Sequence, residues 1–322
     1  MRKLLVFAVC GALALGAAAC GDDDDDSGGG GSGGGGGDLS GTIRIDGSST
    51  VAPFAQAAAE EFSATNPGVR VTVGTSGTGG GFEKFCAGET DISDASRPIE
   101  PDEADVCKKN NITYTEVQVA NDGIAVTTNP DLKVDCMTVA QLKELWNKGS
   151  KVTKLSEIDP SFPDTTLKLF GPGTDSGTFD FFTEQINGEE GVSRTDYQPS
   201  EDDNVLVQGV EGEAGGLGYF GFSYYEQNQD KLNLVGVGES ANNCVKPESS
   251  NIQSGEYKPL SRPLLMYPSG KAIKKPEVKA FMDYVLENYQ SIAEASQIVP
   301  MSQEQASKAQ SELSTAEAGS GS

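Results

Sequence analysis

The stretch GPGTDSGTFDFFTE, residues 171–184, predicts a tight turn that leads into an amphipathic helix. Its glycines and proline end the preceding strand pattern, TLKLF, because both residue types interrupt regular structure. Asp175 or Ser176 can cap the helix, since a short oxygen-bearing side chain accepts an orphan backbone N–H. The helix repeats apolar residues at helical spacing, namely Phe179, Phe182 and Ile186. Such a helix start suits an anion, although an ordinary N-cap gives the same pattern.

Two other stretches share this design. Residues 47–50 (GSST) and 74–81 (GTSGTGGG) are Gly/Ser/Thr turns, each between an expected strand and an expected helix. Units of strand, turn and helix that repeat along a chain indicate an α/β fold with largely parallel sheets. Ligands of such folds bind beyond the carboxyl ends of the strands, where these turns lie.

Patterning along the chain gives the approximate extent of the other elements. Strands are expected at residues 39–45, 69–73, 117–127, 166–170 and 215–221. Helices are expected at residues 51–65, 137–146, 201–209 and 276–287, with a further helix beginning at residue 82.

The composition excludes several classes of function. The chain has 322 residues, enough for two domains, and its 24 basic against 48 acidic residues give a net charge of −24. This charge argues against nucleic acid as a partner, because neutralising nucleic-acid phosphates requires a basic face. The chain has no histidine, which excludes Ser-His and Cys-His catalysis and argues against zinc and iron sites. We therefore expect no metal and no cofactor, whereas a small anion held by local N–H groups stays compatible with an acidic chain.

Residues 1–20 have the pattern of a secretory signal, with two basic residues, an apolar run and small residues before Cys20. The run is too short for a comfortable membrane span. The small residues resemble a bacterial lipobox, which would make Cys20 the lipidated N-terminus; plain secretion with cleavage after Ala19 is the alternative. Residues 21–38 contain only Asp, Gly and Ser, so they predict a flexible tether between this anchor and the folded chain.

Several motifs together, and in this order, resemble the phosphate-binding lipoproteins of bacterial high-affinity phosphate ABC transporters. They are GSSTVAPF (47–54), GTSGTGGGF (74–82), DISDASRPI (91–99), VANDGIAV (119–126), GPGTDSGTFDFFTE (171–184) and GGLGYFGFSYY (215–225). The resemblance implies a two-lobed periplasmic-binding-protein fold with two crossings between the lobes, near residues 119–125 and 261–266, and one phosphate in the cleft.

On this resemblance, lobe one should comprise residues 39–120 and 265–312, lobe two residues 121–264, and residues 313–322 a polar tail. Four cysteines remain after the signal and Cys20, and four cysteines allow three pairings. We expect the pairs Cys86–Cys107 and Cys136–Cys244, since each then lies inside one lobe. A bridge between lobes would join surfaces that must move.

The family's phosphate ligands can be carried over residue by residue onto the three turns. The resemblance assigns this role to Ser49, Thr50, Ser76, Gly77, Ser176, Gly177 and Thr178. Many members also have an arginine before the last of these turns, where this chain reads Gly171-Pro172-Gly173.

Many members carry an aspartate, in a Ser-Asp-Ala triplet, that accepts the phosphate proton. Without a gap this aspartate aligns with Arg97, so Ser96 and Arg97 become candidate phosphate ligands; with a two-residue gap it aligns with Asp94. We prefer the ungapped register, because Arg97 then restores the missing guanidinium, whose planar fork suits phosphate. A surface ion pair is the alternative role for Arg97. The proton acceptor stays open between Asp94, Asp122 and Asp175.

The sequence therefore predicts an extracytoplasmic, membrane-anchored and monomeric solute-binding protein that captures inorganic phosphate and delivers it to an ABC permease. A binding protein for sulfate or another tetrahedral oxyanion is the nearest alternative, and a surface adhesin without a small ligand is another. A hydrolase that uses Ser176 is less consistent with the sequence, because GTDSGT lacks the G-x-S-x-G pattern and no histidine could activate the serine.

Overall fold

The structure is a computed structural model that describes residues 39–174 and 176–319. The predicted signal, the lipidation site Cys20, the tether and Asp175 lie outside these residues. Within the described ranges, no helix combines the length and the apolar character needed to cross a bilayer.

One hydrogen-bonded sheet, with strand order β2-β1-β3-β10-β4-β8-β6-β7, runs through the described chain, and β5 and β9 join it beside β4. Its strands are β1 (Gly41–Gly47), β2 (Val69–Gly74), β3 (Ile92–Ala95), β4 (Val117–Thr128), β5 (Cys136–Thr138), β6 (Lys168–Pro172), β7 (Gln198–Ser200), β8 (Gly216–Gly221), β9 (Asn233–Gly238) and β10 (Ser261–Pro268). The parallel pairs β1·β2, β1·β3, β6·β7, β6·β8 and β5·β9 match the expected α/β class.

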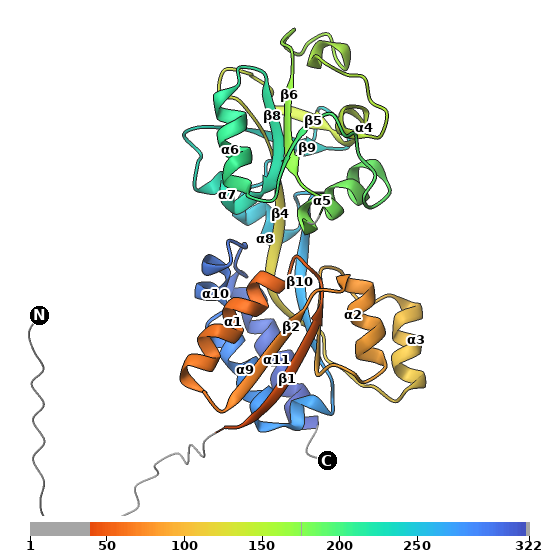
Figure 1. Cartoon of the computed structure of the whole chain (residues 1–322), viewed down its shortest axis with the longest axis vertical. Coiled ribbons are helices and arrows are strands. Elements are labelled where there is room, and N and C mark those ends of the chain that lie inside the picture. Colours follow the sequence, from red (N-terminus) through yellow and green to blue (C-terminus); the bar gives the residue numbers. More distant parts are fainter. Residues whose placement is uncertain (1–38, 175, 320–322) are drawn as a thin grey trace, which may run out of the picture. The chain divides into compact units, whose positions relative to one another are not determined.

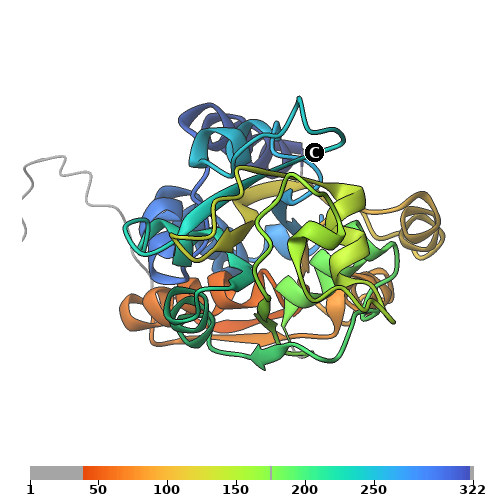
Figure 2. The same cartoon turned by 90° about the horizontal axis from the view of Figure 1, so that it is seen from above.

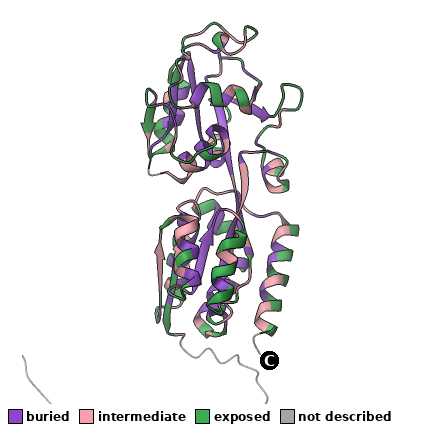
Figure 3. Ribbon diagram, turned by 90° about the vertical axis from the view of Figure 1, so that its right-hand side faces the viewer, coloured by how far each residue is buried: buried purple, intermediate pink, exposed green. Residues whose placement is uncertain are grey.

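Helices cover this sheet and leave their outer faces exposed (Figure 3). The helices of eight or more residues are α1 (Ala52–Thr65), α2 (Gly77–Cys86), α3 (Pro101–Lys109), α4 (Val139–Trp146), α6 (Asp203–Gly212), α9 (Pro276–Glu287) and α11 (Gln303–Gly319). The shorter ones are α5 (Gly177–Phe182), which continues as a π-helical turn over Thr183–Asn187, α7 (Phe222–Glu226), α8 (Ser249–Ser254) and α10 (Tyr289–Ala295).

Strands β4 and β10 connect two lobes (Figure 1). The first part of β4 pairs antiparallel with β10, and residues Ile124–Thr128 of the same strand pair with β8. Strand β10 lies between β4 and β3 and pairs antiparallel with β3 along its other edge. The two crossings therefore lie side by side and hydrogen-bond to each other, so they form a common support for the lobes.

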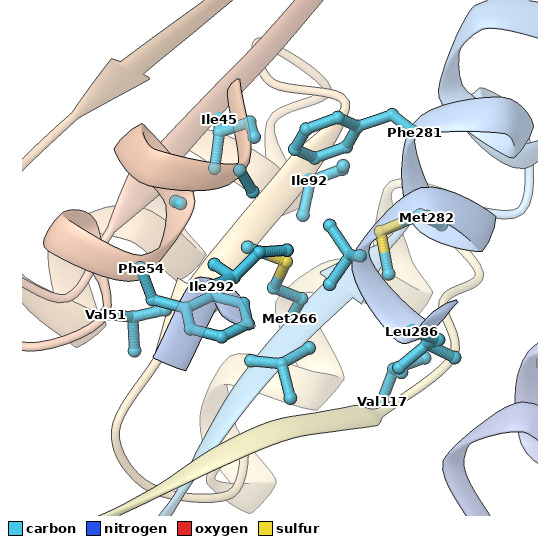
Figure 4. Packing of buried hydrophobic residues seen from close by; sticks show 14 of the residues in the cluster. Ile45, Val51, Phe54, Ile92, Val117, Met266, Phe281, Met282, Leu286 and Ile292 are labelled. Atoms are coloured by element: carbon cyan, nitrogen blue, oxygen red, sulfur yellow. The ribbon is translucent and has the colours of Figure 1, made fainter. Parts of the chain in front are cut away.

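Each lobe has its own hydrophobic core, which we call the first core and the second core. In the first core, residues from β1, α1, β3, β4, β10, α9 and α10 point toward one another (Figure 4). They include Ile45, Val51, Phe54, Ile92, Val117, Met266, Phe281, Met282, Leu286 and Ile292. The second core surrounds Trp146, whose ring lies 4.8 Å from that of Tyr219 and 5.9 Å from that of Phe182. Val299, which the sequence assigned to lobe one, joins this second core because its backbone pairs with Asn121 on β4.

The two expected disulfides are present, Cys86–Cys107 and Cys136–Cys244. The first joins α2 to α3, which stands at an outer edge in both Figure 1 and Figure 2. The second joins β5 to the segment after β9. Each bond therefore stays within a single lobe.

Some element boundaries differ from the sequence prediction. Helix α2 begins at Gly77 instead of residue 82, so the glycine-rich stretch is helical. A Cβ at Gly81 would lie 2.5 Å from the Cα of Gly47, so glycine here permits close packing against the end of β1. Strand β6 continues through Pro172, and α6 continues to Gly212. Helix α4 starts at Val139, because the two residues expected to begin it lie in β5.

The expected polar tail is largely part of α11, which reaches Gly319. Ala306, Ala309 and Leu313 of this helix are buried in the first core at helical spacing. Its last turns are also held by Lys279, whose Nζ lies 2.6 Å from a carboxylate oxygen of Glu317. The tail was missed because its composition is polar, whereas a narrow stripe of small apolar residues is enough to dock it.

Candidate functional site

A pocket of about 540 Å³ opens where the Gly/Ser/Thr turns of the two lobes approach each other. Seven residues predicted from the sequence line it: Ser49, Thr50, Ser76, Gly77, Ser96, Arg97 and Gly177. Of the other candidates, Ser176 and Thr178 flank Gly177 without lining the pocket. Asp94, which is buried, and Asp122, which pairs with Arg262, do not line it either. The structure thus brings the three turns together around one space.

Two hydrogen bonds of Ser48 hold the turn after β1. Ser48 is buried, its backbone N–H donates to the carbonyl of Asp94 (2.9 Å), and its Oγ accepts from the N–H of Thr50 (3.2 Å). Helix α1 then starts with Pro53 in its first turn, where a missing N–H is tolerated. This arrangement fixes Ser49 and Thr50 at the pocket wall.

The start of α5 approaches this turn closely. Ser176 is the N-cap, and its Oγ accepts from the N–H of Thr178 (3.2 Å), so the N-cap interpretation describes the geometry of its side chain. A Cβ at Gly177 would lie 2.4 Å from Thr50 Oγ1 and 2.8 Å from Ser49 Oγ. Glycine permits this close approach of the two lobes, because a Cβ here would displace both hydroxyl groups.

Ser76 sits at the pocket edge with its hydroxyl engaged. Its Oγ donates to Asp46 Oδ1 at 2.6 Å, and its backbone N–H donates to the same oxygen at 3.0 Å. Burial opposes the ionisation of Asp46, but bonds from Lys84 and Ser76 outweigh it and lower the pKa of this carboxyl. In this geometry the hydroxyl of Ser76 donates to a protein carboxylate and not into the pocket.

Arg97 lines the pocket but is paired within its own lobe. Its two Nη atoms each lie 2.8 Å from one oxygen of Glu103, and its Nε lies 3.4 Å from Glu100. The bonds to Glu103 raise the pKa of Arg97 against the opposing effect of burial. The bidentate face of this guanidinium, which the sequence analysis assigned to phosphate, therefore holds a carboxylate, as in the alternative of an ion pair.

Arg262, on the crossing strand β10, was not identified from the sequence. It lies directly opposite Asp122 of β4 in the strand register, and its Nε donates to Asp122 Oδ2 at 3.1 Å. Its Nη1 donates to Ser96 Oγ (3.1 Å), and its Nη2 donates to Thr50 Oγ1 (2.8 Å) and to the carbonyl of Gly177 (3.3 Å). An arginine inside the apolar run LSRPLLMY was the available sequence signal, because an unpaired charge in such a strand is costly.

The surroundings of Arg262 are those of a buried cation. Its side chain is 12% exposed, and its Cζ lies 3.8 Å from the centroid of the Phe181 ring, a distance at which the ring face attracts a cation. Burial lowers the pKa of Arg262, and the neighbouring Asp122 opposes that effect. A guanidinium stays charged in proteins. Arg262 therefore brings a buried positive charge to the pocket wall.

Asp94 is fully buried beneath the turn after β1, and neither of its carboxylate oxygens has a hydrogen-bond partner among the described residues. Burial, followed by the charge of Asp46, raises the pKa of Asp94 well above its usual value. Asp94 is not among the residues that line the pocket.

The pocket wall also carries carboxylates, from Asp180, Glu184 and Glu190. Burial, followed by the charge of Glu190, raises the pKa of Asp180 to about 6. No hydrogen bond to the Asp180 carboxylate is found within the part of the chain that the structure describes. Arg97 and Arg262 supply the positive charge among the described lining residues, so the pocket combines guanidinium groups, hydroxyl groups and an unpaired carboxylate.

Comparisons with known proteins identify the family of the chain. A family model described as a PBP superfamily domain matches residues 32–288. The chain is 44% identical over 261 residues to protein SphX of Synechococcus elongatus, covering 80% of this chain and 77% of that protein. It is 39% identical over 275 residues to the phosphate-binding protein PstS of Staphylococcus saprophyticus, covering 85% and 84%. Among solved structures, a possible phosphate-binding protein from Planctomyces limnophilus superposes with a TM-score of 0.81 at 45% identity, covering 86% of this chain and 99% of that one.

Proposed function

Since the chain belongs to the PBP superfamily, a family of binding proteins and not of enzymes, we propose that it captures inorganic phosphate outside the cytoplasm and delivers it to an ABC permease. Its relationship to a phosphate-binding protein supports the ligand, and the family supports the transport role. The hydrolase alternative is not retained.

The observation that carries the proposal is the direction of the hydroxyl groups in the pocket. Thr50 Oγ1 accepts a hydrogen bond from Arg262, so its own O–H is free to donate toward the pocket. Ser96 Oγ accepts from Arg262 and lies 3.1 Å from Thr78 Oγ1, while Thr78 Oγ1 accepts from the N–H of Ser96. One proton of the Ser96–Thr78 pair therefore also remains for a ligand. A site that presents protons selects a ligand made of acceptors, as an oxyanion is.

Phosphate is favoured over sulfate by the carboxylates of the pocket. At neutral pH phosphate still carries a proton that a carboxylate can accept, whereas sulfate would leave that carboxylate unpaired beside it. Asp94 is buried and does not line the pocket, and Asp122 pairs with Arg262, so Asp180 is the acceptor that the geometry favours. Asp175 stays a further candidate outside the described residues.

For the ligand set, we retain Ser49, Thr50, Gly77, Ser96 and Gly177 as contacts from the pocket wall. Ser176 and Thr178 would act by fixing the start of α5. Ser76 would contribute only if its hydroxyl turned away from Asp46.

A titration tests the proposal directly. Isothermal calorimetry with phosphate should show one saturable site per monomer, and the melting temperature should rise with phosphate concentration. At a hundred times Kd the stabilisation should be about 2.7 kcal/mol. Sulfate should bind much more weakly under the same conditions. Absence of any phosphate effect on heat or melting would refute the proposal, and equal binding of both anions would refute the selectivity.

Location and delivery require experiments in cells. Mass spectrometry of the membrane fraction should find a lipid on Cys20, and Cys20→Ala should release the protein into the soluble extracytoplasmic fraction. Cells that lack the protein should lose high-affinity phosphate uptake, and the parent chain should restore it. Restored uptake by a chain that cannot bind phosphate would contradict the delivery role.

A further inference from the structure

Resting on the proposed function, we infer that Arg262 is the cation that contacts the bound anion, that Asp122 positions it from the neighbouring crossing strand, and that Arg97 remains paired with Glu103. The charge that recognises the ligand then lies on β10, one of the two crossing strands shared by both lobes, and not on the turns of either lobe.

The first argument is the hydrogen-bond inventory of the guanidinium. Arginine has five N–H donors, and Arg262 donates to Asp122, Ser96, Thr50 and Gly177. The remaining proton is on Nη1, which otherwise donates only to Ser96 among the described residues. Both Arg262 and Ser96 line the pocket. The ligand can therefore receive this proton together with the hydroxyl protons of Thr50 and Ser96 or Thr78.

The second argument is that the guanidinium is held in place before a ligand arrives. Asp122 fixes its Nε through a pairing set by the strand register, and the ring of Phe181 supports one face of the group. A preorganised donor loses little conformational entropy on binding, so its bond to an anion contributes more to affinity. Burial also strengthens the bond, because water competes less in a low-dielectric site.

The third argument is that the charge of Arg97 is already matched by carboxylates of its own lobe. Both of its Nη atoms are bonded to Glu103, and Glu100 lies beside its Nε. Glu103 is itself fixed, because it accepts the N–H of Glu100 at 2.8 Å in the capping box of α3. Two carboxylates therefore surround one guanidinium, and this group of charges is net negative and unattractive to an anion.

The contacts of Nη2 give Arg262 a further consequence. This atom donates to Thr50 in the first lobe and to the carbonyl of Gly177 in the second. An anion that binds at Arg262 thus meets a group already bonded to both lobes. The binding energy of the anion therefore stabilises the contact between the turns of the two lobes.

The experiment compares matched substitutions by calorimetry with inorganic phosphate. Arg262→Gln should weaken phosphate binding by about 10- to 100-fold, as expected for loss of a buried charge-assisted bond. Arg97→Gln removes the same charge from the same pocket and should change the affinity by less than about threefold. The reverse order, or an Arg262→Gln protein that binds like the parent, would overturn the inference. If the parent chain does not bind phosphate, the proposed function itself is refuted, and this outcome can be told apart from a failure of the Arg262 assignment.

A second variant covers the case that Arg262→Gln does not fold. Asp122→Asn keeps the shape of the partner but leaves the buried guanidinium without a counter-charge, so the melting temperature without ligand should fall. If phosphate contacts Arg262, it supplies the missing charge, and saturating phosphate should raise the melting temperature by more than it does in the parent. A purely structural ion pair predicts the same loss without this added rescue, and that result would overturn the inference.

Discussion

Gly177→Ala should weaken phosphate binding without destabilising the fold. The new Cβ would lie 2.4 Å from Thr50 Oγ1, 2.8 Å from Ser49 Oγ and 3.2 Å from the backbone nitrogen of Thr50. Side-chain oxygens can rotate away, but the backbone of the turn cannot, so the turn and the start of α5 must separate. Overpacking of this kind costs about 1–3 kcal/mol, which corresponds to a loss of affinity of roughly 5- to 150-fold.

The same substitution should leave the melting temperature of the ligand-free protein unchanged or higher. Gly177 is the first residue of α5, and alanine is favoured over glycine in a helix by up to about 1 kcal/mol. Calorimetry and thermal melting of the same preparation separate the two effects.

Gly212→Ala is the matched control, because Gly212 lies in α6 and its added Cβ would meet nothing within 4 Å. This variant should gain a little stability and bind phosphate like the parent. Unchanged affinity in Gly177→Ala, with normal folding, would show that the contact between the lobes at Gly177 has no part in the site.

Three further predictions concern charge, hydroxyl groups and disulfides. Because the pKa of Asp180 is raised to about 6, its ionisation costs stability as the pH rises from about 4 through 6; Asp180→Asn should therefore melt higher than the parent at pH 7.5, show no gain at pH 4, and discriminate less between phosphate and sulfate. A parent advantage at pH 7.5 would contradict this sign. Thr50→Val removes one hydroxyl donor and the acceptor of an Arg262 proton, and should cost about 1–3 kcal/mol of binding in calorimetry, where an unchanged Kd would count against Thr50 as a ligand. Replacing Cys136 and Cys244 together should lower the melting temperature more than removing the other disulfide, because it opens a separation of 108 residues instead of 21; equal shifts would argue that loop entropy does not control their contribution.

Much of the fold could be predicted because its signals come from neighbouring residues or from the small number of possible cysteine pairings. The alternation of strands and Gly/Ser/Thr turns gave the α/β class, and the cap at Ser176 follows from one side chain and the next two residues. The cysteine pairs followed once the lobes were expected, because keeping each pair in one lobe leaves a single arrangement. Boundaries were missed where tertiary contacts decide them, as at α11, whose polar sequence is held by a narrow buried stripe.

The sequence by itself predicted which turns gather around one pocket, since glycine, hydroxyl groups and helix starts act over a few neighbouring residues. Only the tertiary structure decided which guanidinium is buried between the lobes at that pocket. Arg262 and Asp122 are 140 positions apart, and their pairing exists only because β10 returns beside β4 in one particular register. Arg97 lies in a motif that attracts attention, but its charge is matched by Glu103 six positions later, and the sequence does not show which acceptor a long side chain will choose. Charges act through distance in space, so their partners are set by the fold.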